Sequence, residues 1–323
     1  MNRLFLAALT ASVFLTACVK TVVVDPYTAG NCIAQCQVGA AAGSLSVLVE
    51  TSGTWRLISA DPWLTTDITG GEGRGAFTFH YASNESDILH IRQGRIGRIA
   101  ICLDESGVAD TLQVIQQGFL SSLTPGETTG DPAVKLEFET TSLRNCSILV
   151  VNSEGLQEAA DWAQGKADVL VVDGVVSGEA EGLLVRGCDF SMLEPDAEYN
   201  AFRSAVDALV RVSDVNGMVL CGTMGHYSMM QTGYPSTPSW YPSDATDAVF
   251  RADRYAWQNK LYDILWMKEQ GFVVTATDEE GKAWASDYLY ISESVLSMVS
   301  AADIMDIPVT GMRHHPLRLI LNY

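Results

Sequence analysis

Residues 143–175 constrain the fold of this chain more than any other stretch of its 323 residues. Two apolar, β-branched runs at 147–151 and 168–172 flank a segment, 156–163, in which apolar residues recur at helical spacing. Strands that are apolar on both faces belong to a sheet that is covered on both sides. The stretch therefore predicts a β-α-β unit inside a layered α/β domain.

Polar residues follow each of the two predicted strands. Asn152 comes directly after the first strand, and Asp173 and Gly174 come directly after the second. Because α/β sheets bind ligands outside the carboxyl ends of their strands, an active site of this domain is expected at these positions.

The length and charge of the chain narrow the classes of function. With 323 residues and 47% hydrophobic content, the chain is long enough for two domains of roughly 150 residues each. Its formal net charge is −19, whereas nucleic-acid binding draws most of its affinity from Lys and Arg placed against phosphates. Nucleic acid is therefore disfavoured as a partner.

The N-terminus carries a targeting signal. Arg3 gives a positive start, residues 4–15 form an apolar run, and Leu15-Thr16-Ala17-Cys18 is a small-residue cleavage site. The run is too short for a transmembrane helix, which needs about 20 apolar residues. The site resembles the lipobox of bacterial lipoproteins, which implies removal of residues 1–17, a lipid on Cys18 and a place in the cell envelope, at the outer membrane. The alternative is an ordinary secretory signal with a cysteine there by chance.

Six further cysteines follow, and only two of them are close in sequence. Cys32 and Cys36 are near enough to pair as a disulfide in an oxidising compartment, and a zinc site there lacks a nearby His. The sequence leaves a bridged and a free pair both open. The other four lie in or beside apolar runs and are expected to be small core residues: Cys102, Cys146, Cys188 and Cys221.

Residues 18–43 contain a Pro, several Gly and a run of small residues, which predicts a tether between the membrane and the first domain. A short helix within residues 32–42 is the alternative to a fully irregular tether.

Residues 44–118 show short apolar runs separated by Gly, Asn and Asp, a pattern typical of a β-sandwich. The segments that carry a family resemblance are SGTWRLIS, DPWLTT, GGEGRGAFTFHYASN, RIGRIAICL and TLQVIQQG. They resemble the BACON domain, an immunoglobulin-like module of Bacteroidetes surface proteins. The resemblance implies an all-β immunoglobulin-like sandwich and, through the glycan-degrading proteins that carry such domains, a link to carbohydrate.

Trp55 and Trp63 are the candidate glycan contacts of this domain, because an indole ring can stack on a sugar ring. Both are interpreted first as core residues, since large aromatics supply much of the buried area of a small sandwich.

Residues 119–134 are rich in Ser, Thr, Gly and Pro and predict a linker, after which a second domain runs over residues 135–323. Beyond the β-α-β unit, the patterns predict strands at 182–186, 218–222, 272–277, 288–291 and 317–322, and helices at 198–212 and 254–270. A loop with several prolines and aromatics is predicted at 226–245.

In this order the strands resemble those of the endonuclease/exonuclease/phosphatase family. Its fold is a four-layer α/β sandwich, and its enzymes cut phosphoesters with a divalent metal. The matching segments are SILVVN, ADVLVVDGV, VLCGTMG, SDYLYIS and MRHHPLRLIL. The resemblance implies site positions at Asn152, Asp287 and His314.

The chain departs from the family where the chemistry takes place. Four motifs lack their usual residues, and the chain instead has Gly174, Thr223 with Gly225, Gly187 with Cys188, and Arg313. The metal-binding Glu is among the missing residues. Asp173 precedes its position, and because successive side chains of a strand point to opposite faces, Asp173 is expected to face away from the site unless a bulge intervenes.

Asn152, Asp287 and His314 are therefore interpreted as remnants of a site. We expect a binding or scaffold role in the cell envelope, in which the hydrolase-like domain has lost catalysis, the partner is a glycan or an envelope protein, and no cofactor or metal is bound. The alternative is a metal-dependent phosphodiesterase or phosphatase with altered residues, which would use Mg²⁺ or Mn²⁺.

The lipid anchor is directly testable. A Cys18→Ser variant of the full chain is expected to leave the membrane fraction, because the thiol that carries the lipid is gone. Fractionation of the cells followed by detection of the protein measures this. Equal amounts of variant and wild type in the membrane pellet contradict lipidation.

Overall fold

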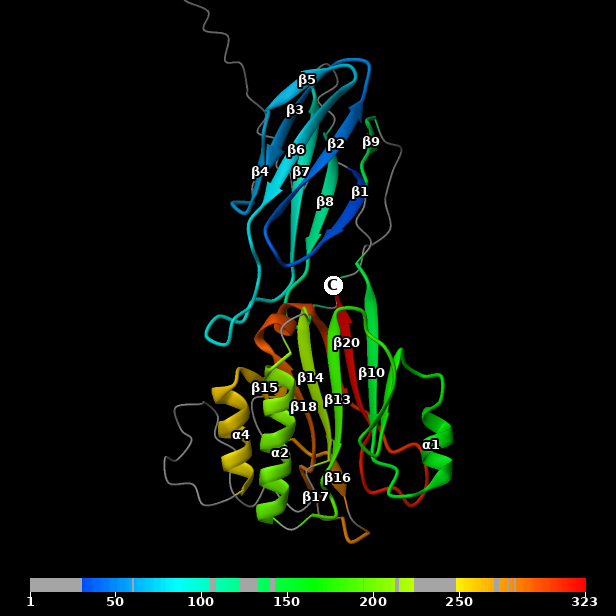
Figure 1. Cartoon of the computed structure of the whole chain (residues 1–323). Coiled ribbons are helices and arrows are strands. Elements are labelled where there is room, and N and C mark those ends of the chain that lie inside the picture. Colours follow the sequence, from blue (N-terminus) through cyan, green and yellow to red (C-terminus); the bar gives the residue numbers. More distant parts are fainter. Residues whose placement is uncertain are drawn as a thin grey trace, which may run out of the picture.

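The structure, a computed structural model, describes residues 31–59, 61–104, 109–121, 123, 133–139, 143–193, 195–212, 215–223, 248–269, 273–277, 279–281 and 283–323. The predicted signal peptide, Cys18, Gly225 and the loop at 226–245 lie outside these residues. The described chain is mostly β-strand with few helices and several sheets, which agrees with the expectation of a multidomain, β-rich protein (Figure 1). Within the described part, no helix is long and apolar enough to cross a membrane.

The first unit, called the first sandwich, consists of two sheets packed face to face (Figure 1). One sheet has the order β1-β8-β7-β3-β5, with β1 (Asn31–Val38), β8 (Ala109–Gln116), β7 (Arg95–Leu103), β3 (Thr54–Ser59) and β5 (Gly70–Glu72). The other has the order β4-β6-β2-β9, with β4 (Leu64–Thr66), β6 (Gly75–Tyr81), β2 (Gly43–Glu50) and β9 (Lys135–Glu137). Alternate side chains, such as Phe77 and Phe79 of β6, fill the space between the sheets.

Trp55 belongs to this core and is 1% exposed. Its indole N–H donates to the carbonyl of Gly73 over 3.2 Å. Gly71 and Gly75 face the ring, and a Cβ at these positions would come within 2.7 and 3.0 Å of the Trp55 side chain. These glycines make room for the indole, and Trp55 is a core residue whose ring has no surface left for a glycan.

Trp63 is half-buried, and the guanidinium of Arg95 lies 4.3 Å from the centre of its ring. This cation–π contact covers one face of the ring. Of the two tryptophans, Trp63 is the one that keeps exposed surface, and its contact with a glycan stays a prediction.

The prediction that residues 18–43 are a tether is wrong for residues 31–38, and so is the alternative of a helix there. These residues form β1, which pairs in parallel with β8 and contributes Cys36 and Val38 to the core. The partner strand lies far along the sequence, so the local pattern of small and polar residues did not reveal the pairing.

The position of β1 also excludes the disulfide between Cys32 and Cys36, one of the two alternatives that the sequence left open. Four residues of extended chain span about 13 Å, whereas a disulfide needs Cα atoms within about 7 Å. Both thiols are free, and burial raises the pKa of the Cys36 thiol to about 12. The remaining cysteines of the described chain are free and buried, as expected of core residues: Cys102, Cys146, Cys188 and Cys221.

The predicted start of the second domain at residue 135 differs from the strand pairing. β9 pairs with β2, and the Asp110 carboxylate accepts hydrogen bonds from the backbone N–H groups of Ala133 (2.7 Å) and Val134 (2.8 Å). The chain therefore returns to the first sandwich before it enters the second unit at β10 (Asn145–Val151).

The second unit, called the second sandwich, also has two facing sheets (Figure 1). One has the order β12-β11-β10-β20-β19, with β12 (Val175–Gly178), β11 (Val169–Val172), β20 (Leu317–Asn322) and β19 (Val299–Ile304) beside β10. The other has the order β13-β14-β18-β15, with β13 (Leu183–Asp189), β14 (Gly217–Thr223), β18 (Asp287–Ser292) and β15 (Leu261–Asp263). A separate pair consists of β16 (Ala276–Thr277) and β17 (Ala283–Trp284).

Helices cover the outer faces of both sheets (Figure 1). Helix α1 (Gln157–Ala163) packs on the sheet that contains β10, and α2 (Pro195–Val210) and α4 (Ala248–Gln258) pack on the other. Two short helices follow β15 and β18, namely α5 (Ile264–Glu269) and the 3-10 helix η2 (Glu293–Met298).

The sequence of β10 explains this layering. Ile148 and Val150 lie in the core between the two sheets, whereas Leu149 and Val151 pack with Ala159 of α1. β10 pairs in parallel with β11, as the β-α-β pattern predicts. A strand that is buried on both faces thus has a helix on one side and the second sheet on the other.

The helix predicted at 254–270 is divided in the structure. α4 ends at Gln258, Lys260 has a left-handed backbone with φ of 58°, and β15 pairs with β18 before α5 begins. Leu261 and Tyr262 are buried in that pairing. Pairing with a distant strand outweighs the helical spacing of the segment.

The two sandwiches are stacked end to end (Figure 1). Phe119, with Ile88 and Leu120, packs against the core of the second sandwich, and the backbone N–H of Ser86 donates to Ser297 Oγ over 2.7 Å. β1 and β8 run toward this junction, whereas β10 and β14 run away from it (Figure 1). The carboxyl ends of β10 and β14 therefore lie at the pole opposite the first sandwich.

These pairings set the limits of a fragment that folds alone. A fragment of residues 31–139 keeps β1 and β9 and is expected to melt cooperatively as a β-sandwich. A fragment of residues 44–118 loses both strands, and with them two buried core residues of β1, so it is expected to be unfolded. Circular dichroism with thermal melting of both fragments measures this. A cooperative melt of the shorter fragment at the temperature of the longer one contradicts the assignment of β1 to the core.

Candidate functional site

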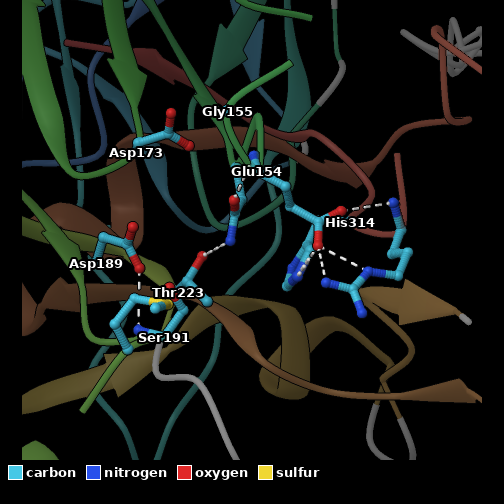
Figure 2. A pocket seen from close by; sticks show the side chains of 10 residues that line it. Glu154, Gly155, Asp173, Asp189, Ser191, Thr223 and His314 are labelled. Carbon is cyan, nitrogen blue, oxygen red and sulfur yellow. Dashed lines mark hydrogen bonds and ion pairs between the residues drawn. The ribbon is translucent and has the colours of Figure 1, made fainter. Parts of the chain in front are cut away.

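A cleft of about 560 Å³ opens at the pole where β10, β13 and β14 end (Figure 2). Its lining comes from the segments after β10, β11 and β13, from the end of β14 and from the segment before β20: Asn152, Glu154, Gly155, Asp173, Asp189, Ser191, Met192, Thr223, Arg313 and His314. The location follows the rule that α/β sheets bind ligands beyond the carboxyl ends of their strands.

A line of buried hydrogen bonds forms the floor of the cleft. Asn152 follows β10, Thr223 ends β14, and Asp287 begins β18 directly opposite Thr223 in the strand pairing. Asn152 Nδ2 donates to Thr223 Oγ1 over 2.8 Å, and Thr223 Oγ1 donates to Asp287 Oδ1 over 2.5 Å. Two of the predicted site residues, Asn152 and Asp287, are thus joined through Thr223.

His314, the third predicted residue, completes this line. Its Nδ1 donates to Asp287 Oδ2 over 2.7 Å, and the side chain is 8% exposed. The hydroxyl of Ser286 donates to the same oxygen over 3.0 Å. Thr275 Oγ1 accepts from the backbone N–H groups of Ser286 (2.9 Å) and Asp287 (3.0 Å), which fixes the start of β18. The structure therefore brings Asn152, Asp287 and His314 together.

Glu154 is a site residue that the sequence reasoning missed. It lies after β10, and one of its carboxylate oxygens is 3.8 Å from His314 Nε2 (Figure 2). Arg313 donates to the same carboxylate through Nε (2.7 Å), through Nη2 and through its backbone N–H (3.0 Å). The sequence contains one signal for Glu154: it is an acid two residues after Asn152, on a segment already expected at the site.

The imidazole of His314 lies between two carboxylates. Burial by itself lowers the pKa of His314, but the hydrogen bond and charge of Asp287, together with the charge of Glu154, outweigh burial and the positive charge of Arg313. The pKa of His314 is therefore raised above its ordinary value of 6.5. For Glu154, burial raises the pKa, and the hydrogen bonds and charges of Arg313 and His314 reverse this and hold it below its ordinary value.

The expectation that Asp173 faces away from the site is wrong, because Asp173 lines the cleft. Its backbone is left-handed, with φ of 47°, and Gly174 follows with φ of 76°. The strand has already turned at this point, so the alternation of side chains no longer applies. The Asp173 carboxylate accepts from the backbone N–H (2.7 Å) and the hydroxyl (2.5 Å) of Ser153.

Three acids at the cleft, Asp287, Asp173 and Glu154, already accept hydrogen bonds within the protein and do not by themselves fit a Mg²⁺ or Mn²⁺ ion. Such ions need several oxygen ligands, usually including carboxylates. Both oxygens of Asp287 accept side-chain hydrogen bonds, those of Asp173 accept from Ser153, and those of Glu154 accept from Arg313. Throughout the described residues, no group of three or more His, Cys, Asp or Glu is arranged to hold a metal ion.

Three comparisons with known proteins were informative to different degrees. No family model and no curated protein matches the chain. An AP endonuclease from Archaeoglobus fulgidus has a similar structure, with 13% identity, a TM-score of 0.43, and coverage of 55% of this chain and 99% of that one. The Bacteroides ovatus GH5 xyloglucanase in complex with a XXXG heptasaccharide matches with 13% identity and a TM-score of 0.23 over 25% of this chain. The chain spans 16% of the length of that enzyme. Neither likeness establishes a family or an activity.

The raised pKa of His314 makes the stability of the protein depend on pH. An unfolded-state pKa of about 6.5 and a higher folded-state pKa mean that this stabilisation is complete below about pH 6.5 and is lost as the pH rises through the folded-state value. Each pKa unit by which the folded state exceeds the unfolded state contributes about 1.4 kcal/mol to the free energy of unfolding. His314→Gln is therefore expected to remove this decline from the free energy of unfolding, measured by urea denaturation between pH 6 and 9. His80→Gln, at an exposed position of β6, is the control. An unchanged decline in His314→Gln contradicts the assignment.

Proposed function

We propose that this chain is a lipid-anchored binding protein of the bacterial cell envelope, whose second sandwich has an endonuclease/exonuclease/phosphatase-like fold without metal-dependent hydrolysis. The observation that carries the proposal is the hydrogen bonding of the Asp287 carboxylate. Both of its oxygens are taken by Thr223, Ser286 and His314, in a floor that is buried and hydrogen-bonded throughout. A carboxylate that already accepts these bonds has little to offer a cation.

The charges of the cleft support the same conclusion. Among the described residues that line it, three are carboxylates, Glu154, Asp173 and Asp189, and two are basic, Arg313 and His314. Because Glu154 and Arg313 form an ion pair, the remaining acids on the opposite wall repel an anionic phosphoester. A neutral or cationic polar ligand is favoured.

In this proposal the first sandwich is a BACON-like module. Strand β1, where the described chain begins, starts at the end of the first sandwich that is farther from the junction, and the cleft lies at the pole of the second sandwich where β10 and β14 end. An anchor at Cys18 would hold the cleft away from the outer membrane, where it meets a glycan or an envelope protein. Of the two candidates Trp55 and Trp63, it is Trp63 that has exposed surface for a glycan.

Metal-dependent phosphodiesterase or phosphatase activity is the second candidate. The observation in its favour is the Asp287–His314 pair, a carboxylate hydrogen-bonded to a buried imidazole that faces the cleft. Such a pair can hold and transfer a proton at Nε2. Phosphoester hydrolysis in addition needs a cation against the phosphoryl oxygens, which these residues do not provide.

Metal binding and turnover separate the two candidates. The mature protein is expected to give no heat of binding with MgCl₂ or MnCl₂ and no metal-dependent hydrolysis of bis(p-nitrophenyl) phosphate or p-nitrophenyl phosphate. Calorimetric titration and absorbance assays measure both. Turnover that requires added metal and disappears in Asp287→Ala and His314→Ala would establish the hydrolase instead.

A further inference from the structure

The turn that presents Glu154 to the cleft is strained. Glu154 and Gly155 both have left-handed backbones, with φ of 49° and 79°. A residue with a side chain seldom adopts this conformation, which persists only when its surroundings hold it. The local bonds are from the Glu154 N–H to Asn152 Oδ1 (3.0 Å) and from the Gly155 N–H to Ser153 Oγ (3.2 Å).

Asp173 holds this turn from the neighbouring strand. Its two carboxylate oxygens accept from the backbone N–H and the hydroxyl of Ser153, and its own N–H donates to the carbonyl of Val151 over 3.0 Å. These bonds tie the end of β11 to the end of β10, one residue before the strained position. With Ser153 fixed, the carboxylate of the next residue, Glu154, lies beside His314 (Figure 2) and pairs with Arg313.

We propose that Asp173 is a positioning residue of the cleft, which through Ser153 fixes the left-handed turn and keeps the Glu154 carboxylate beside His314. The inference rests on the proposed binding function, because a ligand in the cleft would contact the imidazole and the two carboxylates beside it. Three charges that act on His314 are those of Asp287 from β18, Glu154 from the turn and Arg313 from its own segment. In this proposal an effect of Asp173 on His314 passes through Glu154, because Asp173 bonds to Ser153, the residue before Glu154.

The Asp173 carboxylate and the two groups of Ser153 that donate to it are called a Ser–Asp clamp. The chain contains a matched control for this clamp. At the other end of the same strand pair, Asp168 Oδ2 accepts from the backbone N–H (2.8 Å) and the hydroxyl (2.7 Å) of Ser147. This second Ser–Asp clamp also joins β10 to the start of β11, but it lies at the opposite end of the strands from the cleft. A variant of Asp168 therefore shows the effect of losing any such clamp, and a variant of Asp173 shows the effect of losing the clamp at the cleft.

The test is the titration of His314 in the mature full-length protein, followed by nuclear magnetic resonance of labelled histidines and assigned with His314→Gln. Glu154→Gln is expected to lower the pKa of His314, because a negative charge that raises it is removed. Asp173→Asn, which tolerates the left-handed backbone, is expected to lower it in the same direction. The double variant is expected to match Glu154→Gln alone, and Asp168→Asn to match the wild type.

Several results overturn the proposal. One is a wild-type titration of His314 in Asp173→Asn while Glu154→Gln shifts it; another is a further shift when Asp173→Asn is added to Glu154→Gln. An equal shift of the His314 pKa in Asp168→Asn assigns the effect to a general loosening of the β10–β11 strand pair. If Asp173→Asn does not fold, Ser153→Ala against Ser147→Ala makes the same comparison. Metal-dependent turnover refutes the proposed function without changing these titrations.

Discussion

The burial of β10 on both faces is the constraint on which the second sandwich depends. One set of its side chains fills the core between the two sheets and the alternate set fills the core under α1. A strand with no polar face cannot lie at a surface, so a helix and a second sheet must cover it. Asn152 is the first residue beyond that apolar run, and it therefore emerges at the end of the sheet, where a buried polar group needs partners from the facing sheet.

Those partners make the cleft. Asn152, Thr223, Asp287 and His314 come from both sheets and satisfy one another in a single line of hydrogen bonds. Arg313 introduces a cation beside His314, and the Glu154 carboxylate from the turn after β10 matches it. The charges around the imidazole are therefore balanced within the protein. Under the proposed binding function a ligand adds to these hydrogen bonds, whereas a metal ion would have to replace them.

The sequence alone determined the local features with a strong period or composition. The β-α-β unit, the helix now seen as α2 and the terminal strand β20 follow from the apolar spacing, and the core cysteines from their apolar neighbours. The resemblance of the strand segments to a known family implies Asn152, Asp287 and His314 as site positions, and the structure brings them together. Such features depend on residues that are close in the chain, or on a fixed strand order.

Only the tertiary structure decided what depends on distant partners. β1 is a strand because β8 lies beside it, β15 interrupts a helical pattern because β18 pairs with it, and β9 returns to the first sandwich because β2 offers an edge. Asp173 faces the cleft because the backbone has turned left-handed after β11, and Glu154 reaches His314 because that turn is held from the next strand. Each of these contacts joins segments that the chain brings together only on folding, so no local pattern of residues encodes it.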